Sequence, residues 1–336
     1  MTAIPSTLTD NYNRIHNYMR ISITDRCNLR CTYCMPEEGM TFLPNEQLMT
    51  DEEIIQIVRV AAQLGIKKIR LTGGEPLLRP NVVSLVQELS QIEGIEDLAL
   101  TTNGLLLAKM AADLKRAGLK RVNISMDSLK PERFKQMTRG GNLQRVLEAV
   151  ERCTEVGLAP LKLNVVLMRG FNDDEWDDFI QYTIDHPITV RFIEYMPIGG
   201  RQQGWKRDYI SLEERLKGSK WHEQAIPVDK PRHGGPAAYY RLPGAKGQFG
   251  LIHPVSDHFC DTCNRLRITA DGYVKPCLYW SDEFHLRHHI GDDAKLAEVL
   301  IRSLEAKPFN HEMAYELSGQ SLSHQPTTRT MSQIGG

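Results

Sequence analysis

The sequence lacks a long apolar run, a secretory leader and any excess of charge of one sign. It contains no stretch of about 18 apolar residues, which is the length needed to span a bilayer. The polar start "MTAIPSTLTDNYNR" does not show the charged, apolar and small-residue segments of a signal peptide in their usual order. Lys and Arg together number 41 against 42 for Asp and Glu, so the formal net charge is -1. A balanced charge gives no reason to expect a nucleic-acid or membrane surface. We therefore expect a cytoplasmic protein with neither kind of partner.

The cysteines do not form a disulfide framework. Seven is an odd count, and six of the seven fall in two short clusters. The clusters are Cys27, Cys31 and Cys34, and then Cys260, Cys263 and Cys277. Such clusters indicate metal ligation in a reducing compartment. The seventh, Cys153, lies on the helical pattern "VLEAVERCTEV", where we expect an inert thiol in the core.

From "YMRISITD" to "VRFIEYM", β-branched runs alternate with amphipathic stretches, at roughly 25 to 35 residues per strand and helix unit. Strands are predicted at residues 20–24, 68–71, 97–101, 121–126, 161–167 and 190–195. Helices are predicted between them, at residues 51–64, 81–92, 105–117, 142–156 and 173–185. Right-handed crossovers would curl this α/β repeat into a partial (βα)6 TIM-type barrel, two units short of the closed form.

After Tyr195 the repeat gives way to Gly- and Pro-rich segments, with a short helix near residues 211–217 and brief strands up to about residue 267. We expect two regions: the barrel over 1–200, and a smaller α+β region over 201–336 that carries the second cysteine cluster and a Gly-Gly tail. Ligands of parallel βα folds lie at the carboxyl ends of the strands. The motifs "DRCNLRC", "TGGEP", "TTNG", "SMDS" and "EYMP" all follow such ends and should converge on one mouth.

The first cluster has three thiols where zinc and iron-sulfur sites usually take four ligands. Three thiolates on a loop after a strand can hold three irons of a 4Fe-4S cluster and leave the fourth iron open for a substrate or cofactor. A zinc knuckle with its fourth ligand elsewhere is the alternative. In "TGGEP", Gly73 and Gly74 permit close backbone approach, and Glu75 could accept hydrogen bonds from an ammonium group. A plain tight turn is the simpler interpretation of the two glycines alone.

The second cluster has the spacing C-x2-C-x13-C, which suits zinc and iron-sulfur equally. His258, two positions before Cys260, could complete a Cys3His zinc site. Between the cysteines, Arg265 and Arg267 lie at i and i+2, on one face of a strand. Two guanidinium groups beside a metal suit a polyphosphate or carboxylate, although without the cysteines a solvated edge strand would be the simpler interpretation.

Other cations fall beside the same motifs. Arg20 precedes the first cluster, Arg70 precedes "TGGEP", and Lys162 lies on a predicted strand. Together with the two arginines of "CNRLR", the mouth would collect at least five cations in a chain of net charge -1. We therefore expect an anionic substrate.

"CNLRCTYC" on a first βα loop, followed by "GGEP" on the second, resembles the radical S-adenosylmethionine (SAM) superfamily. The resemblance implies that the amino and carboxylate groups of SAM chelate the open iron of the first cluster, and that one electron cleaves SAM to a 5'-deoxyadenosyl radical. It also implies a set of SAM-binding residues. They are Tyr33, Gly74, Glu75, Ser125, Asn164 and Met196. From the residues alone, Tyr33 could equally be packing its own loop.

Within that superfamily, the second cluster with "CNRLR" and the motifs "LTTNG", "NISMDSL" and "FIEYMPIGG" resembles the GTP 3',8-cyclase family. The resemblance implies a second 4Fe-4S cluster whose open iron binds the guanine of GTP. The implied GTP-binding residues are Arg20, Arg70, Thr101, Lys162, Arg265, Leu266 through its backbone, and Arg267. The three cysteines of the first cluster, Arg265 and Arg267 are the implied catalytic residues, and the tail residues Gly335 and Gly336 would enter the site. A disordered end is the alternative for the tail.

The same resemblance implies a reaction and partners. The deoxyadenosyl radical would take hydrogen from the ribose C3' of GTP, and the C3' radical would attack C8 of guanine. The product would be 3',8-cyclo-7,8-dihydro-GTP, in the first step of molybdopterin biosynthesis. We also expect an electron donor that is flavodoxin-like, a downstream pyranopterin monophosphate synthase, and a homodimer.

Two other functions fit parts of the sequence. A radical SAM peptide maturase also carries auxiliary clusters, but such regions have more cysteines than the three found here. A zinc protein that binds RNA through local basic patches would use both cysteine clusters structurally. The net charge near zero and the lack of interleaved basic and aromatic residues disfavour it.

Overall fold

Parallel strands occupy the places that the sequence predicts. The computed structural model describes residues 6–36, 38–199, 204–230, 235–317 and 319–335. The predicted strands are β3 (Tyr18–Ser22), β4 (Lys68–Thr72), β5 (Asp97–Thr102), β6 (Arg121–Ser125), β7 (Lys162–Leu167) and β8 (Thr189–Glu194). Each pairs in parallel with the next along the chain. Their ends lie within two residues of the predicted ones, because the alternation of buried side chains defines a strand locally.

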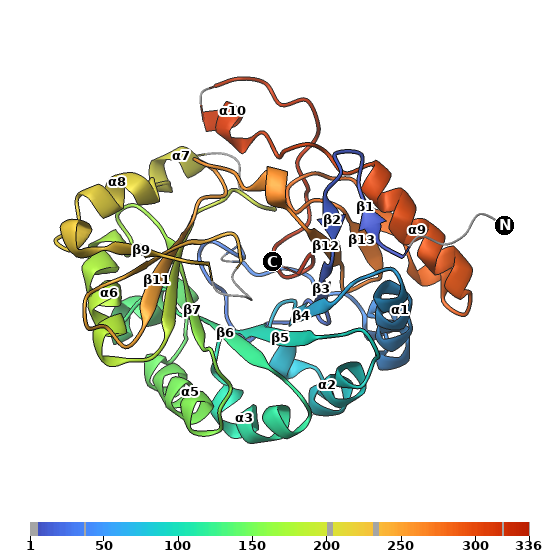
Figure 1. Cartoon of the computed structure of the whole chain (residues 1–336), viewed down its shortest axis with the longest axis horizontal. Helices are drawn as coiled ribbons and strands as arrows, with labels where there is room; N and C mark the ends of the chain where they lie inside the picture. The colour runs from blue at the N-terminus through green and yellow to red at the C-terminus, as the bar shows by residue number, and fades with distance from the viewer. Residues whose placement is uncertain (1–5, 37, 200–203, 231–234, 318, 336) are drawn as a thin grey trace.

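Helices cross between these strands and cover the outside of the sheet (Figure 1). They are α1 (Asp51–Gln63), α2 (Val82–Ser90), α3 (Leu107–Arg116), α4 (Pro131–Thr138), α5 (Leu143–Glu155) and α6 (Trp176–Asp185). α1 begins where the Thr50 side chain accepts a hydrogen bond from the Glu53 N–H, and the Glu53 side chain accepts one from the Thr50 N–H. α4 was not predicted. Its buried apolar side chains, Phe134 and Met137, are too few to give a clear helical period.

The C-terminal region extends the same sheet at both edges. Its strands are β9 (Ile226–Val228), β10 (Ala238–Arg241), β11 (Gln248–Ile252), β12 (Arg265–Ile268), β13 (Tyr273–Lys275) and β14 (Phe284–His285). The sheet order is β14-β13-β12-β3-β4-β5-β6-β7-β8-β11-β10-β9. β12 is parallel to β3 and β11 is parallel to β8, so the parallel run is two strands longer than predicted. The partial barrel itself is confirmed.

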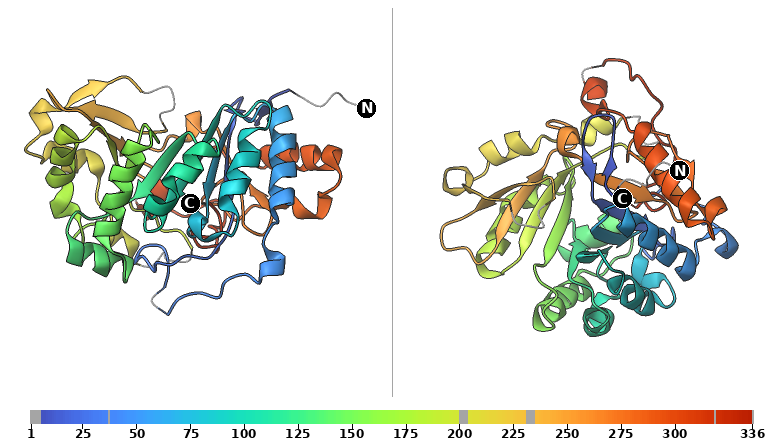
Figure 2. Two further views of the ribbon diagram at one scale, coloured as in Figure 1. Left: turned by 90° about the horizontal axis from the view of Figure 1, so that it is seen from below. Right: turned by 45° about the vertical axis from the view of Figure 1, so that its right-hand side comes forward.

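The remaining elements lie around this barrel. They are the hairpin β1 (Leu8–Thr9) and β2 (Ile15–His16), and the helices α7 (Trp205–Asp208), α8 (Leu212–Lys217), α9 (Asp293–Glu305) and α10 (Met313–Leu317). α9 packs beside α1 and the strand β1, so a late helix of the sequence lies against early elements on one side of the barrel (Figure 2). Among the described residues, no helix combines the length and apolar character that a membrane crossing needs.

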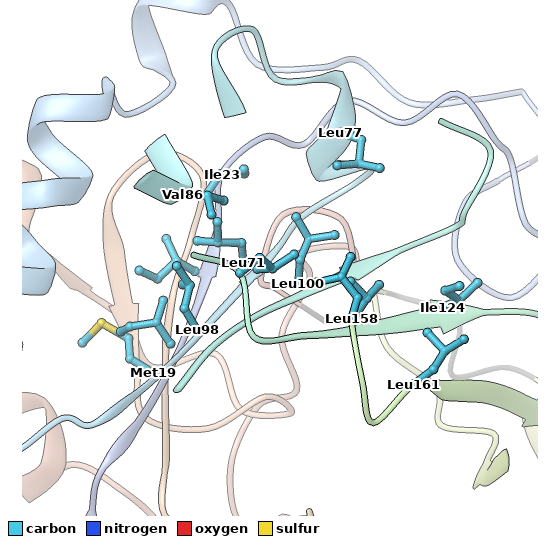
Figure 3. Packing of buried hydrophobic residues seen from close by; sticks show 14 of the residues in the cluster. Met19, Ile23, Leu71, Leu77, Val86, Leu98, Leu100, Ile124, Leu158 and Leu161 are labelled. Atoms are coloured by element: carbon cyan, nitrogen blue, oxygen red, sulfur yellow. The ribbon is translucent and has the colours of Figure 1, made fainter. Parts of the chain in front are cut away.

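The main apolar core lies between the sheet and the helices. Met19, Leu71, Leu98, Leu100 and Ile124 are each 2% exposed or less and come together from neighbouring strands (Figure 3). Full burial of each such side chain contributes about 1.5–3 kcal/mol. Successive residues of a strand point to opposite faces, so the residues that alternate with this core point into the barrel.

Cys153 belongs to the core, as expected. It is fully buried on α5, and burial raises the pKa of its thiol to about 12.

A second apolar cluster lies away from the main core and joins segments that are far apart in sequence. It includes Tyr195, Trp205, Tyr279 and Trp280, together with Ile334 near the end of the chain. Tyr33, Met196 and Cys277 are partly buried against it. The last described residues reach the middle of the ring of strands (Figure 1). Residues from both predicted cysteine sites and the tail therefore meet on one apolar support.

Candidate functional site

Cationic side chains line the inside of the barrel. They alternate along their strands with side chains of the main core, which places them on the inward face. The cations are Arg20, Arg70, Arg121, Lys162, Arg191, Arg265 and Arg267. Arg267, Arg20 and Arg70 lie side by side in register on β12, β3 and β4. Arg121 donates to the Asp97 carboxylate at 3.0 Å. Three adjacent strands thus present a row of guanidinium groups, as the predicted anionic substrate requires.

The pKa values of these groups reflect burial and mutual repulsion. Burial, together with the charges of Arg191, Arg121 and Arg70, lowers the pKa of Lys162 to about 6. Burial and neighbouring arginines also lower the pKa values of Arg20 and Arg191 to about 10. Like charges held together in a buried site favour the binding of an anion, because an anion relieves their repulsion.

Tyr18 shares this environment. Burial opposes its ionisation, but the charges of Arg70, Arg20 and Arg265 lower the pKa of its phenol to about 8.

Arg191 and Arg121 were missed by the motif analysis. Arg191 donates through Nε to Asn164 Oδ1 at 3.0 Å, which connects a predicted SAM residue with the cationic interior. In "TVRFIE" the arginine lies between Val190 and Phe192, both fully buried in the core. A charged residue that alternates with core residues on an interior strand was the available signal.

The predicted GTP residue Thr101 lies beside Arg70, whose guanidinium is 3.4 Å from the threonine hydroxyl. The Leu266 side chain is fully buried in the main core, which leaves only its backbone for a ligand. Both positions agree with the arrangement that the resemblance implies. Their contact with GTP stays a prediction.

The tail ends among the predicted triphosphate residues. The Gly335 carbonyl accepts hydrogen bonds from Arg20 Nε at 2.9 Å and Arg267 at 2.6 Å. Gly335 has φ +68°, and a Cβ there would lie 2.7 Å from Thr72 Oγ1, so a glycine is needed. The Ser332 carbonyl accepts a hydrogen bond from Ser22 Oγ at 3.0 Å. Through residue 335 the tail therefore lies against Arg20 and Arg267 inside the barrel, while Gly336 lies outside the described residues. A role of the tail in the site stays a prediction.

The first three cysteines lie on the loop after β3. The Cys31 carbonyl accepts hydrogen bonds from the N–H groups of Cys34 at 2.9 Å and Met35 at 3.0 Å, which forms a tight turn. The Cys27 sulfur accepts one from the Leu29 N–H at 3.4 Å. Burial, and then the charges of Cys34, Asp127 and Cys27, raise the pKa of Cys31 well above its usual range. The thiols thus lie within electrostatic reach of one another.

The donor set fits an iron-sulfur cluster with one open iron. None of the three cysteines is in a disulfide, all three are partly exposed, and they come from a single loop at the barrel mouth. No three His, Cys, Asp or Glu side chains in the described residues already surround a point where one ion would sit. The fit therefore depends on two features: thiolates are the ligands that hold iron-sulfur clusters, and these three lie on one partly exposed loop.

Gly73 and Gly74 hold the second βα loop against the cysteine loop. A Cβ at Gly73 would lie 2.1 Å from the Thr24 carbonyl oxygen, and one at Gly74 would lie 2.3 Å from that of Arg26. The Gly74 N–H donates to the Thr24 carbonyl at 2.8 Å. Only glycine permits this approach, so the packing of the two loops by itself accounts for both glycines. Contact of Gly74 with SAM stays a prediction.

Glu75 has a structural role that the sequence did not reveal. Its fully buried carboxylate accepts hydrogen bonds from the Leu77 N–H at 3.0 Å, the Thr102 hydroxyl at 2.7 Å and the Asn103 N–H at 2.7 Å. Burial raises the pKa of Glu75 to about 7 against the effect of these donors. The carboxylate joins the second and third βα loops, and its contact with a SAM ammonium stays a prediction.

The other predicted SAM residues lie on the loop after β3, on β6 and β7, and just after β8. Tyr33 donates to Asp127 Oδ2 at 2.8 Å, and Asp127 Oδ1 accepts the Val166 N–H at 2.8 Å. Burial raises the pKa of Asp127 to about 6. Ser125 and Asn164 are register partners on β6 and β7. Met196 packs on the same apolar cluster as Tyr33.

The second three cysteines surround the start of β12. The Cys263 N–H donates to the Cys260 carbonyl at 3.0 Å, in a 3-10 turn that leads directly into the arginine strand. Burial, and then the charges of Cys277 and Cys263, raise the pKa of Cys260 to about 12. Burial also opposes ionisation of Cys263, but Arg265 and Lys307 lower the pKa of that thiol to about 6.

His258 does not decide between zinc and iron. Its ring packs edge to face on His311 with ring centroids 5.5 Å apart, and its buried Nδ1 has no hydrogen-bond partner among the residues that the structure describes. The Cys3His alternative therefore stays open on geometry.

Comparisons with known proteins identify the family of this chain. Residues 21–183 match the model of the radical SAM superfamily, and residues 188–313 match the model described as Molybdenum Cofactor Synthesis C. The GTP 3',8-cyclase of Listeria monocytogenes is 53% identical over 98% of this chain and 99% of its own length. That of Limosilactobacillus fermentum is 50% identical, with coverage of 98% and 99%.

Solved structures show the same fold at low identity. SuiB of Streptococcus suis bound to S-adenosylmethionine has a TM-score of 0.61 and 14% identity, over 88% of this chain and 69% of that chain. A second SuiB structure has a TM-score of 0.57 and 16% identity, over 80% of this chain and 62% of that chain. From its relatives and its site, the chain belongs to the radical SAM superfamily and, within it, to the GTP 3',8-cyclase family.

Proposed function

We propose that this chain cyclises GTP to 3',8-cyclo-7,8-dihydro-GTP, the first step of molybdopterin biosynthesis. The observation that carries the proposal is the row of Arg267, Arg20 and Arg70 inside a barrel whose mouth holds two sets of three cysteines. Such a row suits a triphosphate. The names of relatives at about half identity over nearly the full length support GTP as the nucleotide.

One set of residues at the barrel mouth would bind SAM, and another would bind GTP. Cys27, Cys31 and Cys34 would hold a 4Fe-4S cluster, and Tyr33, Gly74, Glu75, Ser125, Asn164 and Met196 would hold SAM beside it. SAM bound there supplies the 5'-deoxyadenosyl radical. Cys260, Cys263 and Cys277 would hold a second 4Fe-4S cluster at the guanine end of GTP. A substrate held between two fixed sites keeps its reacting ribose carbon oriented.

The triphosphate would exchange with a contact already present. Arg20 and Arg267 now donate to the neutral carbonyl of Gly335. Charged phosphate oxygens make stronger hydrogen bonds to guanidinium than a peptide carbonyl does. The tail would then shift along the site and help to exclude water from the radical reaction.

The proposal also includes partners and a setting. A flavodoxin-like electron donor would reduce the first cluster, and a pyranopterin monophosphate synthase would consume the product. We further propose a cytoplasmic homodimer with two regions that meet near residue 200. These parts rest on the resemblance and on the balanced charge of the chain.

The decisive experiment is anaerobic. The protein is reconstituted with iron and sulfide, supplied with SAM and a reductant, and 5'-deoxyadenosine is measured with GTP, with ATP and without nucleotide. Strong stimulation by GTP alone, with a cyclised product of the expected mass, supports the proposal. SAM cleavage at the same rate with and without GTP would still show radical SAM activity but would refute GTP as the substrate. Zinc in place of the second cluster would favour the Cys3His alternative.

Variants separate substrate binding from cluster assembly. Arg265→Ala or Arg267→Ala should weaken GTP binding at least tenfold while both clusters assemble, because neither side chain is a metal ligand. Loss of iron in these variants would make the arginines structural. Cys277→Ser should abolish cyclisation and leave SAM binding at the first cluster intact.

A further inference from the structure

A buried lysine holds together the two segments that carry the second set of cysteines, which are the turn with Cys260 and Cys263 and the segment that leads into Cys277. Lys307 follows α9 and is only 5% exposed. Its ammonium donates to the Arg265 carbonyl at 3.1 Å and to the Pro276 carbonyl. Arg265 lies two residues after Cys263, and Pro276 directly precedes Cys277. One ammonium group therefore fixes the spacing between two proposed ligand segments.

The Cys260 end of the turn is held by a different cation. Arg14 donates to the Cys260 carbonyl at 2.8 Å, and its Nε also pairs with Asp10 Oδ2 at 2.6 Å. Arg14 is thus neutralised by its own carboxylate. In the described part of the chain, Lys307 forms no ion pair with a carboxylate. A buried cation without a counter-ion is costly, so its retention points to a nearby anion.

The first set of cysteines has buried carboxylates beside it. The Glu75 N–H donates to the Arg26 carbonyl at 2.7 Å, which puts a buried carboxylate residue next to the cysteine loop. Asp127 accepts a hydrogen bond from Tyr33, which lies between Cys31 and Cys34. The first site is thus flanked by two carboxylates as well as by Arg30, which donates to the Cys27 carbonyl at 2.7 Å, whereas a lysine without a carboxylate partner flanks the second.

We propose that Lys307 is a positioning residue of the second cluster that also raises its reduction potential. The inference rests on the proposed function, because it requires iron rather than zinc at this site. A 4Fe-4S cluster gains one negative charge on reduction, and a fixed positive charge nearby stabilises that reduced form. The ammonium also holds the carbonyls beside Cys263 and Cys277, so the charge cannot move away.

The test is a redox titration of the full-length reconstituted protein, followed by electron paramagnetic resonance. A variant with Cys27, Cys31 and Cys34 all replaced by alanine assigns the signal of the second cluster. In Lys307→Met we expect the ratio of reduced to oxidised second cluster at a fixed potential to fall at least tenfold. That change is a midpoint lowered by about 59 mV for a one-electron couple. Lys307→Arg should keep the wild-type midpoint, and the first-cluster signal should not move.

Asp10→Asn with Arg14→Gln is a matched control. This double variant removes a carbonyl contact to Cys260 without changing the net charge. We expect lower thermal stability with an unchanged midpoint. A shift equal to that of Lys307→Met would show that backbone contacts set the potential, and would overturn the charge argument.

The outcomes distinguish this inference from the proposed function. Wild-type protein with about four irons per chain, rather than the eight that two clusters need, refutes the second cluster itself. An iron-replete Lys307→Met with the wild-type midpoint refutes only the role of Lys307. If Lys307→Met and Lys307→Gln both fail to assemble the second cluster, Lys307→Arg decides. Assembly with the wild-type midpoint supports the inference, and failure of the arginine variant overturns it.

Discussion

Lys162 gives GTP binding a pH dependence that can be worked out from the structure. Its ammonium is buried in the barrel, near Arg70 on β4, Arg121 on β6 and Arg191 on β8, with Asp97 of β5 acting in the opposite direction. Burial and these charges lower its pKa to about 6, so at pH 7 most of the free protein carries neutral Lys162. A bound triphosphate favours the charged form, and binding therefore takes up a proton.

The magnitude follows from linkage. When the pKa of Lys162 rises from about 6 to above 8 on binding, affinity falls tenfold for each pH unit between 7 and 8. That slope is about 1.4 kcal/mol per unit. At pH 7 the uptake should be roughly 0.9 proton per GTP. The γ-phosphate is ionised throughout this window, since its pKa is near 6, so the slope reports the protein.

Anaerobic titration calorimetry in buffers of different ionisation enthalpy measures both quantities. Lys162→Arg keeps a charge at all pH values and should bind GTP without the slope. Lys162→Met should bind more weakly and also without the slope. Tyr18→Phe controls for the nearby phenol, whose pKa is about 8. A wild-type affinity that is constant between pH 7 and 8, or the same slope in Lys162→Met, would refute the reasoning.

Three further changes have defined outcomes. Gly335→Ala should lower cyclisation at least tenfold with full iron content, because φ +68° and a contact at 2.7 Å exclude a side chain; unchanged turnover would show that the tail is dispensable. Glu75→Ala should destabilise the fold by about 1–3 kcal/mol for each of two abandoned backbone N–H groups, seen as a lower melting temperature; an unchanged melt would contradict this. The pKa of His16 is about 4, below its ordinary 6.5, because it is buried. As the pH falls from 6.5 toward 4, the unfolded chain protonates His16 before the folded chain does, so the folded protein loses stability, by at most about 3 kcal/mol. His16→Gln should flatten anaerobic thermal melts between these pH values, and an equal loss in both proteins would point to other groups.

Local patterns were enough to predict the strands and the motif loops. β4 begins at the predicted residue, and β7 and β8 begin one residue from theirs, because core side chains alternate along each strand. The parallel pairing of β11 and β12 with the barrel strands was not predicted. β12 pairs with β3 across nearly the whole chain, for example Arg267 with Arg20, and no local pattern records such a partner. The two extra parallel strands could therefore be identified only from the three-dimensional structure.

In the candidate site, too, short motifs were predictable and long-range contacts were not. The cysteines and the arginines of "CNRLR" carry their chemistry in their spacing, so they could be named in advance. Glu75 could not be understood that way. Its partners Thr102 and Asn103 lie 27 and 28 residues further along, and they reveal a carboxylate that joins two loops. Arg191 lies within a strand and belongs to no motif, yet it is one of the buried cations around Lys162.

The cationic interior explains affinity for a triphosphate but not the choice of base. Arg20, Arg70 and Arg267 would meet the phosphates of ATP as well as those of GTP, because the two nucleotides differ only in the base. Discrimination must therefore arise where the base lies. Cys263 precedes Arg265 by two residues and β12 carries both site arginines, so the second cysteine site is the nearest chemistry beyond the phosphate row. If the second site holds the guanine, as proposed, a comparison of GTP with ATP tests that site, while the arginine variants test the phosphate row.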